Sequence, residues 1–196
     1  MVYFSLTIGL LMRGVIIMQK KSSLLKLVLC ALFTALLAAC SQIQIPLPYV
    51  PINLALFAVH LAGALLGPLY GGVSVLIYLL LAAVGVPVLA GFRGGFGALM
   101  GSTGGYVVGY IFTAVIAGFG SRYWGDRFWK LCVSMTVGFV VCYVFGTIWY
   151  MILSGNSLAV SLFYCVWPFI PGDIVKVLLA ALLTLRLRKP LAAILQ

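Results

Sequence analysis

The feature that most constrains this chain is a series of apolar runs separated by short segments rich in glycine, proline or basic residues. Hydrophobic residues make up 65% of the sequence and charged residues 7%, whereas a soluble domain has about 25% charged residues. In lipid every peptide group must be hydrogen-bonded within its own segment or a closed sheet. The sequence therefore predicts an all-α integral membrane protein with six transmembrane helices, at about residues 24–40, 52–66, 69–84, 97–119, 131–153 and 172–185.

The basic residues orient these spans. Ten of the twelve lysines and arginines lie before or at the start of the first span, between the fourth and fifth spans, or after the sixth. With an inside amino terminus all these segments fall on one side, as the positive-inside rule requires. We therefore expect both termini in the cytoplasm. The same placement explains the net charge of +10 without a nucleic-acid partner.

Residues 1–17 form an apolar extension that precedes a second potential start at Met18. Its length is marginal for a span, so an upstream extension, a signal-like segment and an interfacial helix lying on the bilayer are all open. We expect that it does not cross the membrane. The working unit is then one six-helix membrane domain over residues 18–196.

Two basic residues, Arg93 and Lys176, fall on the outer side together with Asp173. Asp173 and Lys176 are three residues apart, so they share one face of the last helix. Ionisable residues near lipid are costly and usually functional; the alternative is a mutual salt bridge that only positions the helix. We expect an outward-opening pocket roofed by a proline-rich loop, residues 41–51, and a glycine-rich loop, residues 85–95.

The side chains expected at this pocket suit a small, partly apolar anion with a polar head. Arg93 offers a planar fork for a carboxylate, although a solvated loop residue is the alternative. Asp173 can accept hydrogen bonds from amide-like N–H groups, and Lys176 can donate to a carbonyl or carboxylate. Nearby aromatic residues could cover an apolar ring, while core packing or lipid contact is the commoner role of each: Tyr49, Phe92, Phe96, Tyr106, Tyr164 and Trp167.

Glycines recur every fourth residue in the segment expected to form the fourth span, at Gly97, Gly101, Gly105 and Gly109. On a helix this spacing makes one bare stripe, along which another helix or a ligand can approach the backbone.

Several function classes lack the residues that they need. No Gly-x-x-x-x-Gly-Lys-[Ser/Thr] phosphate loop is present, so ATP hydrolysis would require other subunits. The five cysteines have no CxxC spacing, which favours apolar packing over disulfides or metal ligation. His60 has no second histidine or acidic ligand near it, which favours a core or interfacial role. The sequence predicts neither an enzyme nor a metal or cofactor site.

Five motifs occur in a fixed order: Gln42-Ile43-Gln44-Ile45-Pro46-Leu47-Pro48, Ala62-Gly63-Ala64-Leu65-Leu66-Gly67, Gly85-Val86-Pro87-Val88-Leu89-Ala90-Gly91-Phe92, Thr103-Gly104-Gly105-Tyr106 and Pro171-Gly172-Asp173-Ile174-Val175-Lys176. Each is weak alone, but together, over residues 24–189, they resemble BioY, the biotin-binding S-component of energy-coupling factor transporters. The resemblance implies a high-affinity biotin-binding subunit in a prokaryotic plasma membrane. It also implies partners, namely a transmembrane coupling protein and two cytoplasmic ATPases.

The resemblance assigns roles to individual residues. Asp173 and Lys176 would hold the ureido head of biotin and Arg93 its valerate carboxylate, with exchanged roles for Lys176 and Arg93 as the alternative. Asn53-Leu54-Ala55 stands where the family usually has Thr-Leu-Gln. Ser102 stands where the family usually has a proline. The remaining members of the expected substrate-binding set are Gln44, Tyr49, Asn53, Gly97, Tyr106 and Tyr164.

Small residues on the first helix are implied to contact the coupling protein. Here Ala31, Ala35 and Ala39 recur every four residues and form a smooth stripe. Packing within the bundle itself is the alternative. A self-sufficient secondary transporter or facilitator of a small organic anion is the competing function, and uptake by vesicles that contain this chain alone would distinguish it.

Overall fold

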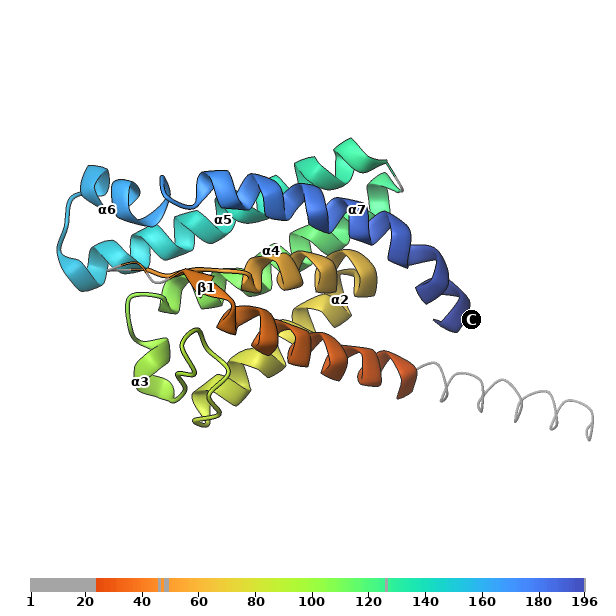
Figure 1. Cartoon of the computed structure of the whole chain (residues 1–196), viewed down its shortest axis with the longest axis horizontal. Helices are drawn as coiled ribbons and strands as arrows, with labels where there is room; N and C mark the ends of the chain where they lie inside the picture. The colour runs from red at the N-terminus through yellow and green to blue at the C-terminus, as the bar shows by residue number, and fades with distance from the viewer. Residues whose placement is uncertain (1–23, 46, 48–49, 126, 196) are drawn as a thin grey trace, which may run out of the picture.

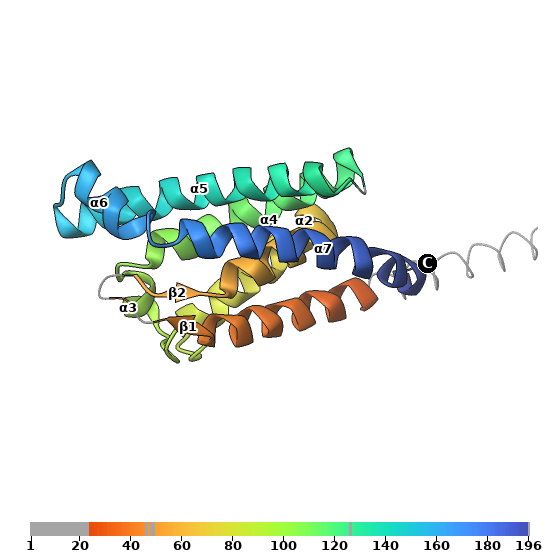
Figure 2. The ribbon, with the colours of Figure 1, turned by 45° about the horizontal axis from the view of Figure 1, so that its top comes forward.

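The structure is a computed structural model that describes residues 24–45, 47, 50–125 and 127–195. These residues form an elongated helical bundle with one small antiparallel sheet (Figures 1 and 2). The extension at residues 1–17 lies outside them. In chain order the elements are the helix Leu24–Gln42, β1 (Gln44–Ile45), β2 (Ile52–Asn53), α2 (Ala55–Ala83), α3 (Phe96–Leu99), α4 (Gly104–Trp124), α5 (Phe128–Ser154), α6 (Leu158–Cys165) and α7 (Ile170–Leu195).

The chain is a multi-pass membrane protein. Four helices among the described residues are long and apolar enough to span a bilayer: Leu24–Gln42, α2, α4 and α5. A fifth span results if α6 and α7, which meet at a 51° bend, are counted as one. The apolar surface of these helices agrees with the integral membrane protein that the composition predicts. The two-residue strands β1 and β2, which pair Gln44 with Asn53, depart from an all-α fold.

Helix α2 folds back on itself at Gly67. The backbone there has φ 82° and ψ 175°, a conformation that favours glycine, and Pro68 follows it. A Cβ added to Gly71 would lie 2.6 Å from the Cα of Gly63, although residues eight apart in a straight helix are separated by about 12 Å. The two halves of α2, orange and yellow in Figure 1, therefore run side by side. The reversal falls at the Gly67-Pro68 turn that the sequence places between two spans.

Helix α4 packs between α2 and α5. On the α2 side, a Cβ on Gly63 would lie 2.1 Å from the Ala114 carbonyl oxygen, so a larger residue could not occupy this crossing. On the α5 side, Thr113 Oγ1 donates a hydrogen bond to the Gly138 carbonyl over 2.9 Å. Small residues and interhelical hydrogen bonds are the means by which helices associate in lipid. They hold α2, α4 and α5 as one rigid core.

The first helix turns Phe33 and Leu37 toward the bundle, where both are buried. Thr34 Oγ1 fixes this orientation by donating to the Ser74 carbonyl in the second half of α2 over 2.9 Å. The alanines of the predicted stripe, Ala31, Ala35 and Ala39, lie on the opposite face and are exposed. Within the described residues, this stripe therefore does not pack against the rest of the bundle.

The predicted fourth span requires correction. The spanning helix α4 begins at Gly104 rather than at residue 97, and it continues to Trp124. Gly97 lies in the separate short helix α3, and Gly101 lies in the turn between them, where its carbonyl accepts a hydrogen bond from Trp149 Nε1 over 3.0 Å. Glycine favours helix weakly, so this segment does not extend α4. The four glycines consequently do not form one stripe.

Other boundaries differ less. The second span begins at Ala55 because Ile52 and Asn53 are paired in β2. The segment between the fifth and sixth predicted spans contains the short helix α6. The helices α4 and α5 extend into the segment between the fourth and fifth predicted spans, leaving a connection of only three residues between Trp124 and Phe128.

The two ends of the bundle carry different features. One end holds β1, β2, the glycine-rich loop, α3 and α6, on the left of Figure 1. The other holds the Gly67 turn, the α4–α5 connection and the carboxyl terminus. Seven of the nine described basic residues belong to the segments at this second end, which we call the basic end: Lys26, Arg122, Arg127, Lys130, Arg186, Arg188 and Lys189.

Candidate functional site

A cavity opens at the end of the bundle opposite the basic end. The space between its walls is about 610 Å³, open solvent included. Segments distant in sequence build it: the β1–β2 hairpin, both halves of α2, the glycine-rich loop, α3, α4, α5 and α7. Its lining residues are Val50, Pro51, Asn53, Leu56, Tyr78, Leu89, Ala90, Arg93, Ala98, Thr103, Tyr106, Val107, Tyr110, Tyr143, Phe169 and Lys176.

Aromatic side chains make up much of this wall. The Tyr106 hydroxyl donates to the Cys165 carbonyl over 2.6 Å, and its ring lies parallel to Phe169 with centroids 6.2 Å apart. A Cβ on Gly146 would lie 2.4 Å from the Tyr106 ring, so this glycine provides the space that the ring occupies. The Tyr78 hydroxyl donates to the Val88 carbonyl over 3.1 Å. With the hydroxyl groups bonded to the backbone, these rings form a fixed, largely apolar surface.

Lys176 brings a cation to the inner side of the cavity. Its Nζ donates to Asp173 Oδ1 over 2.7 Å, and the Tyr143 hydroxyl donates to Asp173 Oδ2. Lys176 is 7% exposed and Asp173 is 4% exposed. The pair expected from the three-residue spacing is therefore formed, and Asp173 lies behind Lys176 rather than on the cavity wall. A buried charged pair with hydrogen bonds on both carboxylate oxygens holds the ammonium in one position.

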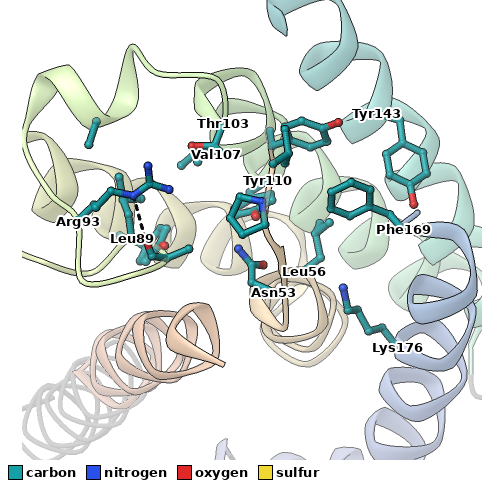
Figure 3. A pocket seen from close by; sticks show the side chains of 16 residues that line it. Asn53, Leu56, Leu89, Arg93, Thr103, Val107, Tyr110, Tyr143, Phe169 and Lys176 are labelled. Atoms are coloured by element: carbon teal, nitrogen blue, oxygen red, sulfur yellow. Dashed lines mark hydrogen bonds between the residues drawn. The ribbon is translucent and has the colours of Figure 1, made fainter. Parts of the chain in front are cut away.

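Arg93 brings a second cation to the other side of the cavity. Leu89 and Arg93 form an antiparallel bridge within the glycine-rich loop, and Arg93 Nε donates to the Ala90 carbonyl over 3.1 Å. The residue is exposed. Figure 3 shows Arg93 and Lys176 on opposite sides of the cavity, with Asn53 between them. The site therefore presents two separated cations across a largely apolar gap.

Gln42 positions the loop that carries Arg93. Its Nε2 donates to the carbonyls of Val88 and Leu89, each over 3.1 Å, and its Oε1 accepts from the Phe92 N–H over 2.9 Å. Phe92 has φ 55°, a left-handed conformation that is uncommon for a residue with a side chain. The side-chain amide of Gln42, at the end of the first helix, thus holds the glycine-rich loop in place.

The structure brings some of the predicted residues together and separates others. On the cavity wall are Asn53, Arg93, Tyr106 and Lys176. The structure does not bring Gln44, Gly97 or Tyr164 to this wall. Gln44 pairs with Asn53 in the sheet, Gly97 is exposed on α3, and Tyr164 lies on α6 in an edge contact with Phe163. Tyr49 lies outside the described residues.

Three tyrosines on the wall were not predicted: Tyr78, Tyr110 and Tyr143. Each lies within an apolar run on a different helix. Tyrosine is enriched at membrane interfaces, and one placed within a span needs a hydrogen-bond partner. That signal could have identified all three as candidates. It could not have shown that they face the same space.

The cysteines and His60 lie in the core. Cys30, Cys40, Cys132, Cys142 and Cys165 are buried and free. His60 is fully buried, with its ring centroid 4.6 Å from that of Phe139. No group of three or more His, Cys, Asp or Glu residues that could hold a metal ion occurs in the described part of the chain.

Comparison with known proteins identifies the family. Residues 18–193 match the BioY family. A probable biotin transporter BioY from Pyrococcus horikoshii is 39% identical over 163 residues, which cover 82% of this chain and 94% of the relative. A biotin transporter BioY from Thermotoga maritima is 36% identical over 165 residues, covering 84% and 96%.

A solved structure has the same fold. The crystal structure of the S-component for biotin from an ECF-type ABC transporter superposes with a TM-score of 0.80 and 32% identity, covering 85% of this chain and 92% of that chain. The relatives are named as transporters, so this chain is a membrane protein of a transport family and not an enzyme. From the extent of the match and the shared fold, we conclude that the chain belongs to the BioY family.

Proposed function

We propose that this chain is the biotin-binding S-component of an ATP-driven vitamin importer. The observation that carries the proposal is the pair of cations, Arg93 and Lys176, on opposite sides of one aromatic-walled cavity. Biotin is an apolar bicycle with a ureido group at one end and a carboxylate on a flexible chain at the other. A cation on each side of an aromatic-walled cavity would suit a molecule with polar groups at both ends and an apolar middle.

In the arrangement that we favour, the ureido group lies at the inner end. Lys176 would donate to the ureido carbonyl, while Asp173, which lies behind it, would hold the ammonium in position. The rings of Tyr106 and Phe169 would cover the apolar bicycle. The exposed guanidinium of Arg93 would bind the carboxylate, to which its planar fork is suited. Exchanged roles for Arg93 and Lys176 are the alternative.

We further infer six membrane crossings with both termini in the cytoplasm. Counting the two halves of α2 separately gives six crossings in total, with the last made by α7. The clustering of seven basic residues at one end supports a cytoplasmic location for that end. The cavity then opens outward. Delivery inward would depend on a separate coupling protein and two ATPases.

The exposed alanine stripe on the first helix is the surface that we assign to the coupling protein. Ala35→Leu would place a branched side chain within the alanine stripe, while Ala159→Leu would do so on the exposed surface of α6. Co-purification with the coupling module should fall for Ala35→Leu and persist for Ala159→Leu. Biotin uptake by vesicles with this chain alone would instead favour a self-sufficient transporter.

The deciding experiment is calorimetric titration of biotin and its primary amide into purified, ligand-stripped protein. Arg93→Gln should weaken biotin binding by about 1.5–3 kcal/mol, the usual contribution of a charged hydrogen bond, and should weaken amide binding much less. Arg127→Gln, at the basic end, serves as the control. If Lys176→Gln instead removes the preference for the carboxylate, the two roles are exchanged. Absence of biotin binding by folded protein would refute the proposal.

A further inference from the structure

Two polar side chains meet on the cavity wall between the two cations. Asn53 comes from β2 and Tyr110 from α4; both line the cavity, and Figure 3 shows Asn53 between Arg93 and Lys176. The side chains of Asn53 and Tyr110 are hydrogen-bond partners. Asn53 Oδ1 also accepts a hydrogen bond from the Ala55 N–H over 3.1 Å, which fixes the amide against the start of α2. The pair is therefore held in place on this part of the wall.

The pair has more hydrogen-bond donors than it uses. The Asn53 amide carries two N–H donors, and the Tyr110 hydroxyl carries one O–H donor. The contact between the two side chains uses one of these three hydrogens, whichever group donates. Within the described residues, no further hydrogen bond involves either side chain. Two donors therefore remain for a bound molecule.

Covering these donors with an apolar group is unfavourable, because a buried donor without an acceptor loses its hydration and gains nothing in return. The inference rests on the proposed function, in which biotin extends from Lys176 to Arg93. The ring sulfur of biotin lies between the ureido group and the carboxylate, so it would lie level with Asn53 in either orientation of the ligand. A thioether sulfur is only a weak acceptor. Biotin itself therefore matches the two donors poorly.

A sulfoxide at that sulfur would supply the missing acceptor. Its oxygen is polar, and it makes the sulfur a stereocentre, so the oxygen projects from one face of the ring or from the other. The Tyr106 hydroxyl is bonded to the Cys165 carbonyl, and its ring lies parallel to that of Phe169, so the wall that covers the bicycle is fixed. We propose that the cavity also binds biotin S-oxide, with Asn53 and Tyr110 donating to the sulfoxide oxygen and selecting one epimer.

The test is calorimetric titration of biotin and of each separated sulfoxide epimer into ligand-stripped protein. In the parent we expect one epimer to bind about tenfold more tightly than the other, because only one can make both hydrogen bonds. Tyr110→Phe should weaken that epimer by about tenfold relative to biotin. Asn53→Ser, which keeps an oxygen near the Ala55 N–H but loses the amide N–H groups, should do the same.

Tyr78→Phe is the matched control. It removes a hydroxyl from the same wall, but one that already donates to the Val88 carbonyl over 3.1 Å. The ratio of the sulfoxide and biotin affinities should therefore stay that of the parent. An equal fall of this ratio in Tyr78→Phe and Tyr110→Phe would attribute the effect to wall packing and overturn the proposal.

The remaining outcomes separate this inference from the proposed function. Biotin binding without binding of either epimer, or with equal binding of both, would overturn the inference and leave the biotin site in place. An epimer preference that persists in Tyr110→Phe and Asn53→Ser would also overturn it, because cavity shape alone would then select the epimer. Absence of binding of all three ligands by folded parent protein would overturn both. The epimer comparison in the parent requires no variant, and thermal unfolding checks that each variant folds.

Discussion

Removing the Asp173 carboxylate tests how the buried ion pair contributes to both folding and binding. Asp173→Ala takes away the acceptor of Lys176 Nζ, now 2.7 Å distant, and that of the Tyr143 hydroxyl. The ammonium that remains is only 7% exposed. Breaking a buried pair by removing one partner costs about 3–5 kcal/mol, because the other charge is left without compensation. We therefore expect Asp173→Ala to lower the free energy of unfolding by that amount.

The double variant Asp173→Leu/Lys176→Met separates charge from packing. Replacing both partners of a buried pair by apolar residues is often neutral, so most of the stability should return. The half-buried Tyr143 hydroxyl would still lack its acceptor, which costs about 1 kcal/mol. The double variant should then be about 2–4 kcal/mol more stable than Asp173→Ala, since that single change costs about 3–5 kcal/mol and the unbonded hydroxyl about 1 kcal/mol.

The assay has two readouts. Reversible unfolding in mixed micelles, followed by circular dichroism, gives the stabilities of the parent protein, of Asp173→Ala and of the double variant. Calorimetric titration of biotin gives the affinities. We expect the double variant to fold but not to bind, because the ligand-facing ammonium and its carboxylate are both gone.

Either of two results would refute this reasoning. A double variant no more stable than Asp173→Ala would show that the two charges are not energetically coupled. A folded double variant that binds biotin normally would show that the pair only positions α7. The second result would restore the salt-bridge alternative that the sequence leaves open.

Three further changes have defined outcomes. Gly71→Ala should lower the free energy of unfolding by about 1–3 kcal/mol, because its Cβ would lie 2.6 Å from the Gly63 Cα. Gly172→Ala is the control, since no heavy atom lies within 4 Å of the added Cβ. Equal melting temperatures for the two variants would contradict this prediction. His60→Leu should not reduce thermal stability, since neither ring nitrogen has a hydrogen-bond partner among the described residues, and a clear loss would reveal one. Gln42→Leu should speed hydrogen exchange at residues 88–93 and weaken biotin binding by about 1 kcal/mol, whereas protection equal to that of the parent would argue against its role in fixing the loop.

Much of the architecture follows from local sequence. Hydropathy predicts a multi-pass helical membrane protein because lipid admits only segments that satisfy their own backbone groups. The reversal at Gly67 is readable because glycine permits φ 82° and proline cannot continue the preceding helix. The Asp173–Lys176 contact is predictable for the same reason, since three residues along a helix set the distance between their side chains.

Local sequence does not predict which residues line the cavity wall. Tyr78, Tyr110 and Tyr143 belong to three different helices, and Gln42 reaches a loop nearly fifty residues away. The glycine periodicity at residues 97–109 was a misleading signal, since the chain turns between Gly101 and Gly104 before α4 begins. A period in the sequence describes one face only if the segment is one helix.

The sequence by itself determined the class of protein, the ends at which its charges gather and the ion pair on α7. The tertiary structure alone decided how each helix is rotated about its axis: that Ala35 faces outward and that Tyr106 faces the cavity. The physical reason is that lipid tails and neighbouring helices are equally apolar. Hydropathy therefore cannot distinguish a residue that faces a helix from one that faces the bilayer.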